Sequence, residues 1–238
     1  MSKSTFSNAS SIGDFYRVTN DEYFRVNMVV SLDGNFAGPS GRSRDLSGPK
    51  DLSVLLTLRL LSDVVLVGAR TAIGEKYRYT KVREDLQDIA ESNPPFCLVT
   101  SSLEIPDEAP IFSDTEHRPV ILTASSSDET WHSNHARLAA VADIYVSDSP
   151  YLDGVIIKDS LHKLGFKKIL CEGGPKLLQT LFSSNVVDEL DLTISPTIVG
   201  RPAPVGALGE TLKRLELTSS VTEDDFIFGR YLFANADR

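Results

Sequence analysis

A glycine-rich segment in the second half of the chain has the composition of an anion-binding loop. Glu172-Gly173-Gly174-Pro175-Lys176-Leu177-Leu178 follows a strand-like run and opens a helical pattern. Glycine permits close backbone approach, and the first N–H groups of a helix lack partners within it, so such a loop can hold a phosphate. The segment is neither a Walker loop nor the GxGxxG of a Rossmann fold. On its own it is equally compatible with a turn that needs glycine only for its backbone angles.

A second segment, Gly68-Ala69-Arg70-Thr71, also lies just past a strand-like run. Open α/β sheets bind ligands at the carboxyl ends of their strands, so two such loops favour a binding crevice. The alternative is a solvated Arg70 and a Thr71 that caps a helix.

Three arginines stand where an anion could be held. Arg42 and Arg44 belong to the long polar loop between Gly34 and Arg44, and long loops near strand ends often carry function. Arg59 lies among leucines on a predicted helix, where a guanidinium needs a carboxylate or a ligand phosphate as partner. Extension of Arg59 to solvent over an apolar stem is the other interpretation.

Other chemistries lack support in the sequence. His132 and His135 share a predicted helix face without a third ligand, so we expect a surface helix and no metal. The Gly-x-Ser-x-Gly elbow of many serine hydrolases is absent. Cys97 and Cys171 lie in strand-like runs and are expected to be buried structural thiols.

The elements that must position these residues alternate between strand and helix. A helix of about four turns is predicted after Ser47-Gly48-Pro49, and helical patterns cover Glu129–Val141 and Gly154–Leu164. Strand-like runs are Arg25–Ser31, Asp63–Gly68, Phe96–Thr100, Val120–Thr123, Ile144–Val146 and Lys168–Cys171, with alternating runs at Leu190–Ile194, Leu215–Val221 and Phe226–Phe233. The pattern predicts an α/β fold: a mixed, mostly parallel sheet flanked by helices, with antiparallel C-terminal strands.

Composition restricts the class of protein. The chain has 238 residues, with 33 Asp and Glu against 24 Lys and Arg, a net charge of −9. An acidic chain repels phosphate backbones and anionic lipid, so we expect neither nucleic acid nor membrane partners. Residues 1–22 are rich in Ser and Asn and are predicted to be a flexible arm without a secretion signal. We expect one domain over residues 23–238 and a cytoplasmic location.

Five motifs together resemble a known family. Their order and spacing are similar to those of the reductase domain of the bifunctional riboflavin-biosynthesis deaminase/reductase, which has a dihydrofolate reductase-like fold. The resemblance runs from about residue 25 to residue 233. The motifs are Asn27-Met28-Val29-Val30-Ser31-Leu32-Asp33-Gly34, Leu46-Ser47-Gly48-Pro49, Leu66-Val67-Gly68-Ala69-Arg70-Thr71, Cys171-Glu172-Gly173-Gly174-Pro175 and Val187-Asp188-Glu189-Leu190.

The resemblance implies a dihydrofolate reductase-like mixed sheet, a homodimer and NADPH as cofactor. It implies reduction of the ribosylamino group of a 5-phosphorylated pyrimidine, a diaminopyrimidine or an aminouracil, to the ribitylamino group. The positions matching the family's cofactor contacts are Val29, Thr71, Glu75, Gly173, Gly174, Pro175, Lys176, Leu177 and Leu178. Those matching its substrate contacts are Ser43, Arg59 and Glu172.

For the reaction we expect hydride addition at C1 of the open-chain imine form of the sugar, with the protein supplying orientation and charge. Arg59, helped by Arg42 or Arg44, is expected to hold the substrate phosphate, so Arg59→Ala should chiefly raise KM. Glu172 or Asp33 is the candidate for proton transfer.

Several features depart from the family pattern. Asn35 follows Ser-Leu-Asp-Gly where many members have Lys, and Glu75-Lys76-Tyr77 replaces a frequent Asp-Asn-Pro. The His/Cys zinc signature of the deaminase is missing, so we do not expect deamination.

Two alternatives therefore stay open: a reductase of another heterocycle such as a pteridine, and a nucleotide-binding relative without turnover. Thr100, Ser101 and Ser102 form either the site of the cofactor's 2′-phosphate or a polar turn.

Overall fold

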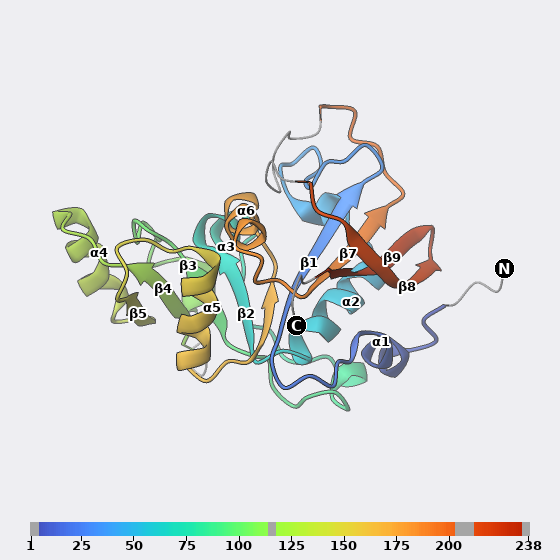
Figure 1. The fold of residues 1–238 in the computed structure, drawn as a ribbon, viewed down its shortest axis with the longest axis horizontal. Coiled ribbons are helices and arrows are strands. Elements are labelled where there is room, and N and C mark those ends of the chain that lie inside the picture. Colours follow the sequence, from blue (N-terminus) through green and yellow to red (C-terminus); the bar gives the residue numbers. More distant parts are fainter. Residues whose placement is uncertain (1–4, 114–117, 203–211, 235–238) are drawn as a thin grey trace.

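The structure is a computed structural model that describes residues 5–113, 118–202 and 212–234. Its centre is a nine-stranded sheet in the order β5-β4-β3-β2-β6-β1-β7-β9-β8 (Figure 1). The strands are β1 (Tyr23–Ser31), β2 (Val64–Gly68), β3 (Phe96–Val99), β4 (Val120–Ala124), β5 (Asp143–Ser147), β6 (Lys168–Cys171), β7 (Glu189–Ser195), β8 (Leu215–Glu223) and β9 (Phe226–Phe233). The predicted strands are confirmed with small shifts at their ends.

The sheet is parallel from β5 to β7 and antiparallel from β7 through β9 to β8. Strand β2 shows why the inner strands read as continuous apolar runs: all four valine and leucine side chains from Val64 to Val67 are fully buried. A parallel strand has helices on both faces, so neither set of alternate side chains meets water. The predicted mixed sheet with antiparallel C-terminal strands is confirmed.

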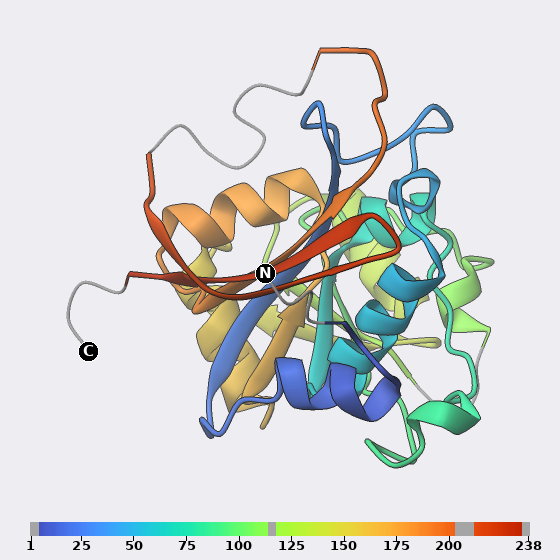
Figure 2. The ribbon, with the colours of Figure 1, turned by 90° about the vertical axis from the view of Figure 1, so that its right-hand side faces the viewer.

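Helices cover both faces of this sheet. They are α1 (Ala9–Tyr16), α2 (Pro49–Leu60), α3 (Ala69–Gly74), α4 (Glu129–Leu138), α5 (Gly154–Lys163) and α6 (Pro175–Ser183), with short 3-10 turns at Ser43–Asp45, Glu84–Leu86 and Pro110–Phe112. One core cluster contains residues of the four helices α1, α2, α3 and α4 together with alternate strand residues such as Val65. The other contains residues of α5 and α6 together with strand residues such as Leu66. Figure 2 shows α6 on one side of the sheet and α1 and α2 on the other.

The expectation of a flexible N-terminal arm is wrong for the described part of that segment. Asn8 caps α1 through a capping box with Ser11. The Asn8 side chain accepts a hydrogen bond from the Ser11 N–H, so an amide without a partner inside the helix is satisfied by a residue type that is frequent in this segment. Phe6, Ile12 and Tyr16 are buried in the core. Apolar side chains at helical spacing, rather than composition, decide that the segment folds; residues 1–4 lie outside the described residues.

Two arginines, the buried Arg25 and the half-buried Arg230, hold α1 to the sheet. Arg25 Nη2 donates to the Tyr16 carbonyl (2.9 Å) and Arg230 Nη1 to the Phe15 carbonyl. Both arginines also pair with Glu189 on β7. The N-terminal helix is therefore bonded to the central strands through one charged cluster.

Both cysteines are free and buried, as predicted. Burial raises the pKa of the Cys97 and Cys171 thiols to about 12, so neither is a thiolate at neutral pH. No helix among the described residues is long and apolar enough to cross a membrane. No group of three or more His, Cys, Asp or Glu side chains in the described part of the chain could hold a metal ion.

Candidate active site

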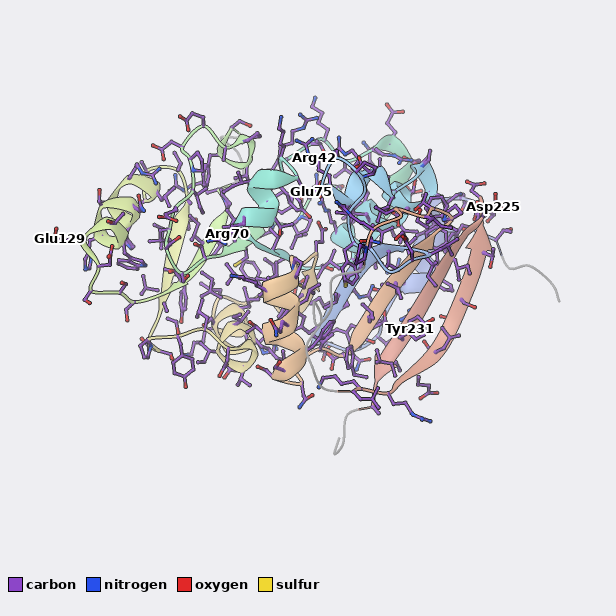
Figure 3. All side chains as sticks on the ribbon, turned by 90° about the horizontal axis from the view of Figure 1, so that it is seen from above. Arg42, Arg70, Glu75, Glu129, Asp225 and Tyr231 are labelled. Carbon is purple, nitrogen blue, oxygen red and sulfur yellow. The ribbon has the colours of Figure 1, made fainter. Side chains whose placement is uncertain are left out.

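A cavity of about 1350 Å³ lies where the first parallel strands end. Its walls come from the loop after β1, from α2, from α3 after β2 and from the loop after β6. The carboxyl ends of parallel strands are where open α/β sheets bind ligands. Figure 3 shows Arg42, Glu75 and Arg70 of this cavity in the middle of the molecule, with Glu129 and Asp225 at opposite ends. The two predicted loops thus meet in one crevice.

The glycine loop forms one wall. The Gly68 N–H donates to the Gly173 carbonyl (2.7 Å) and the Glu172 N–H to the Leu66 carbonyl (3.0 Å), so the loop continues the pairing of β6 with β2. The Gly173–Gly174 peptide is cis, and Gly173 has φ +89°, which favours glycine. Gly174 is the N-cap of α6 and contributes no side-chain cap. The first amides of α6 are therefore available to an anion beside the cavity.

Gly174 and Thr71 leave room for each other only because position 174 has no side chain. A Cβ at Gly174 would lie 2.2 Å from Thr71 Oγ1. Thr71 is the third residue of α3, whose N-cap is Gly68, so Thr71 does not cap the helix. A narrow backbone cradle of this kind beside a helix start is suited to an anionic group.

Arg59, Glu172 and Tyr77 form a half-buried cluster in the wall of the cavity. Arg59 Nε and Nη2 donate to the two carboxylate oxygens of Glu172 (2.6 and 2.7 Å), and the Tyr77 hydroxyl donates to Glu172 Oε2 (2.5 Å). The guanidinium also lies 5.2 Å from the ring centroids of Tyr77 and Phe96. The partner that the sequence required for Arg59 is thus a carboxylate.

The Glu172 carboxylate stabilises the charged form of Arg59 and the protonated form of Tyr77. Burial opposes the charge of Arg59, yet the adjoining Glu172 carboxylate raises the pKa of Arg59 above its ordinary value. Burial and the same carboxylate raise the pKa of Tyr77, so its hydroxyl keeps its proton. Glu172 accepts three hydrogen bonds, which hold its carboxylate in place.

Ser43 and Glu75 meet at another part of the wall. The backbone N–H and the hydroxyl of Ser43 both donate to Glu75 Oε1 (2.8 and 3.1 Å). The predicted substrate contact and the predicted cofactor contact are therefore direct neighbours, and Glu75 ties the loop after β1 to the end of α3.

Asp33 lies elsewhere. It is not among the residues that line the cavity, and its carboxylate accepts hydrogen bonds from Ser31 Oγ (2.6 Å) and from the N–H groups of Val199 (3.1 Å) and Gly200 (2.8 Å). These bonds hold the pKa of Asp33 well below its ordinary value. This position gives no support to a proton-transfer role and instead ties the turn after β1 to the segment after β7.

Most of the other predicted residues line the cavity. Lys176 is exposed and Leu177 packs in the core beneath α6, and neither lines the cavity. Asn35 is buried outside the cavity, where its Nδ2 donates to the Arg201 carbonyl (3.1 Å), so the family's Lys at this position does not correspond to a cavity residue here. Thr100 accepts from the Leu103 N–H, as in a polar turn. The lining includes Val29, Ser43, Arg59, Thr71, Glu75, Glu172, Gly173, Gly174, Pro175 and Leu178.

Sequence analysis missed the strong basic character of the cavity. Only three carboxylates, Asp51, Glu75 and Glu172, accompany its eight Lys and Arg residues. The chain as a whole is acidic, so this concentration is local. The eight are Arg42, Arg44, Arg59, Arg70, Lys76, Arg78, Lys81 and Arg83.

Three further cavity residues, Asn27, Asp51 and Tyr77, were also missed. Asp51 could have been noticed as a carboxylate in the first turn of the helix after Ser47-Gly48-Pro49. Tyr77 gave no sequence signal, because only the folded chain brings it to Glu172.

The mixed, mostly parallel sheet and the crevice at its strand ends define an α/β protein of the predicted architecture. A "pyrimidine reductase-like protein" from Corynebacterium diphtheriae superposes with a TM-score of 0.81 at 26% identity, over 95% of this chain and 98% of that one.

The chain belongs to the RibD C-terminal domain family, whose model matches residues 22–226. Two archaeal relatives are named 2,5-diamino-6-ribosylamino-4(3H)-pyrimidinone 5′-phosphate reductase. The one from Archaeoglobus fulgidus is 29% identical over 88% of this chain and 98% of its own length. The one from Methanothermobacter thermautotrophicus is 29% identical over 88% and 97%.

Proposed function

We propose that the chain is an NADPH-dependent reductase of riboflavin biosynthesis. It converts the ribosylamino group of 5-amino-6-(5-phosphoribosylamino)uracil, or of its 2,5-diamino analogue, to the ribitylamino group. The observation that carries this proposal is the single cavity in which the glycine loop after β6 faces a cluster of basic side chains. The names of the two archaeal relatives support the same reaction.

The cofactor would be held along the glycine loop and the start of α6. Gly173, Gly174 and the first amides of α6 would receive the pyrophosphate, with Thr71 and Glu75 beside it and Val29 at the adjoining strand end. When bound, NADPH supplies the hydride. The other residues that we propose to lie along the cofactor are Pro175, Lys176, Leu177 and Leu178.

The substrate phosphate is better matched to unpaired cations than to Arg59. Arg59 is already bonded to Glu172, whereas Arg44 and Arg70 form no ion pair or hydrogen bond with another described side chain. Arg42 or Arg44 on the loop after β1 would therefore bind the phosphate, and Ser43 between them would contact the sugar. Arg59 would act through Glu172, whose position it fixes.

A homodimer and a cytoplasmic setting complete the proposal. Strand β8 is an edge of the sheet, and Leu217 and Ile227 of the β8–β9 hairpin are 51% and 41% exposed, which suits pairing with a second copy. Two unpaired buried cysteines suit a reducing compartment. Sedimentation equilibrium tests the dimer, and Leu217→Lys should dissociate it.

The reaction itself is tested by absorbance at 340 nm with purified protein. We expect oxidation of NADPH, and much slower oxidation of NADH, when a phosphorylated ribosylaminopyrimidine is present. Mass spectrometry should show a product two hydrogens heavier. NADPH binding without oxidation by either pyrimidine would contradict the proposal and favour a non-catalytic relative.

A further inference from the structure

Two side chains with hydrogen-bond acceptors, Asn27 and Asp51, line the cavity. Asn27 of β1 lines the cavity, and its side-chain Oδ1 is buried without a hydrogen-bond partner among the described residues. A buried carbonyl oxygen that bonds to nothing costs on the order of 1–3 kcal/mol. A ligand N–H that reached this atom from the adjoining cavity would remove that cost.

Asp51 is the second acceptor. It lies in the first turn of α2, lines the same cavity and is 6% exposed. Ser47 Oγ donates to its Oδ2 (2.6 Å), and the Thr193 hydroxyl is a further partner. Both partners are neutral, and no Lys or Arg of the described chain forms an ion pair with Asp51. Burial accordingly raises the pKa of this carboxyl.

The sheet register places the two acceptors together. Val29 of β1 pairs with Thr193 of β7, the partner of Asp51. Asn27 lies two residues before Val29 and so on the same face of β1. That face is the one covered by α2, which packs over the β1–β7–β9 half of the sheet (Figure 1). Asp51 therefore reaches down from the helix toward the strand face that carries Asn27.

An amidine-like edge supplies what this region lacks. In a 2-aminopyrimidinone the 2-amino group and the adjacent ring N–H both donate, whereas a uracil has an acceptor oxygen at position 2. The position 2 oxygen of a uracil would lie against the acceptor oxygens of Asn27 and Asp51. Binding of the uracil would then be weaker, because these buried polar groups would be left without a donor. The Ser47 and Thr193 hydroxyls already donate to Asp51, which leaves the carboxyl's remaining lone pairs for a ligand donor.

We propose that Asn27 and Asp51 form a base-reading subsite that accepts the donor edge of a 2-aminopyrimidinone and discriminates against the 2-oxo analogue. The inference rests on the proposed function and specifies its substrate as the 2,5-diamino compound. Neither residue acts on the reacting carbon; both set which base is held.

The test compares kcat/KM for the two pyrimidines in wild type and two variants. Asp51→Asn exchanges an acceptor oxygen for a donor amide of the same shape, and Asn27→Ala removes the other acceptor. Wild type should prefer the 2-amino substrate about 10- to 100-fold, the discrimination expected of one or two buried hydrogen bonds. In Asp51→Asn this preference should fall to near unity or reverse, and in Asn27→Ala it should shrink.

Controls separate specificity from damage. Asp21→Asn removes an exposed carboxylate and should leave the preference unchanged. The Kd for NADPH, by fluorescence titration, should be close to that of wild type in every variant. If Asp51→Asn does not fold, as judged by circular dichroism, Asn27→Ala carries the test.

The outcomes distinguish this inference from the proposed function. Turnover of either pyrimidine with no change of preference in the variants, or an equal loss for both substrates, would overturn the subsite and leave the reductase standing. Absence of turnover with both pyrimidines in wild type would overturn both proposals together.

Discussion

Arg59 and Glu172 show how one residue pair can serve stability and function together. Glu172 is 3% exposed at its side chain and is bonded at both oxygens by Arg59. Removing one member leaves the other buried without its counter-charge, which costs about 3–5 kcal/mol in comparable pairs. The expectation that Arg59→Ala acts chiefly on KM is therefore too simple.

We expect Arg59→Ala to lower the free energy of unfolding by about 3–5 kcal/mol and kcat/KM as well. The double variant Arg59→Met with Glu172→Gln should be more stable than Arg59→Ala yet still poorly active, because no buried charge is stranded but the fixed carboxylate is lost. Urea unfolding and steady-state kinetics measure the two effects. Unchanged stability with a raised KM in Arg59→Ala would instead support a direct phosphate contact.

Asp33 gives a prediction about pH. Hydrogen bonds from Ser31, Val199 and Gly200 lower its folded-state pKa. A lowered pKa contributes stability that is present above the unfolded-state pKa, near about pH 4, and lost as the pH falls through the folded-state value. Asp33→Asn should thus destabilise the protein at pH 7, and the difference from wild type should shrink below about pH 4. A pH-independent difference in urea unfolding would disprove this reading, with Asp14→Asn as the exposed control.

At the residue scale, sequence patterns identified the residues whose type is unusual for their immediate neighbours in the chain. The glycine loop, Thr71 and Arg59 were recognised because their types stand out next to strand ends or among leucines. Tyr77 and the unpartnered Asn27 oxygen could not be recognised, because their significance depends on contacts between segments far apart in the chain. The sequence gave no sign that the N–H groups of Val199 and Gly200 surround Asp33, because these residues lie far from it in the chain.

Among the elements, α1 departs most from sequence expectation. Ile12 is 2% exposed and belongs to the main core cluster. Ile12→Ala should lower the free energy of unfolding by about 2–4 kcal/mol through lost burial and a residual cavity. Ser10→Ala on the exposed side of the same helix is the matched control and should change stability by less than about 0.5 kcal/mol. Equal, small effects in thermal unfolding would mean that α1 is detached in solution.

The approach of α3 to the glycine loop gives another prediction at this scale. Gly174→Ala places a Cβ against Thr71 Oγ1, so the loop or α3 must shift. The Kd for NADPH should rise about 10-fold or more, as expected when a well-fitted backbone site is displaced. Thr71→Ala in the same chain removes the clashing oxygen and should restore stability in part, with Thr71→Ala alone as the reference. Wild-type affinity in Gly174→Ala would show that the loop does not contact the cofactor.

Element types were predictable because periodicity reports burial directly. The fully buried β2 reads as an unbroken apolar run, and β7, which alternates between buried and half-buried positions, reads as alternating. Helix α1 escaped because it has only eight residues and lies in a segment whose Ser- and Asn-rich composition is typical of a flexible arm. Its stability comes from Arg25, Arg230 and the core, which no local window contains.

For the whole molecule, the distribution of charge matters more than its sum. The chain carries a net charge of −9, yet eight cations and three carboxylates line the cavity. Such a basic hollow attracts phosphorylated ligands while the outer surface repels other polyanions. The acidic total led us to expect no nucleic-acid partner, and it gave no sign of this local concentration of basic side chains.

Salt should therefore weaken ligand binding. Raising ionic strength from about 50 mM to about 500 mM shortens the Debye length below the dimensions of the cavity. KM for both NADPH and the pyrimidine should rise several-fold while kcat changes little. Arg44→Gln should flatten this dependence, and a KM independent of salt would contradict an electrostatic role of the cavity.

The place of β1 in the sheet has a consequence for how the chain matures on the ribosome. β1 ends at Ser31, but its two neighbours, β6 and β7, begin only at Lys168 and Glu189. At usual rates of translation roughly 10 to 30 s pass between synthesis of β1 and completion of its partners. Throughout that interval the central strand has two open edges, so the nascent protein is most prone to aggregate before its last third emerges.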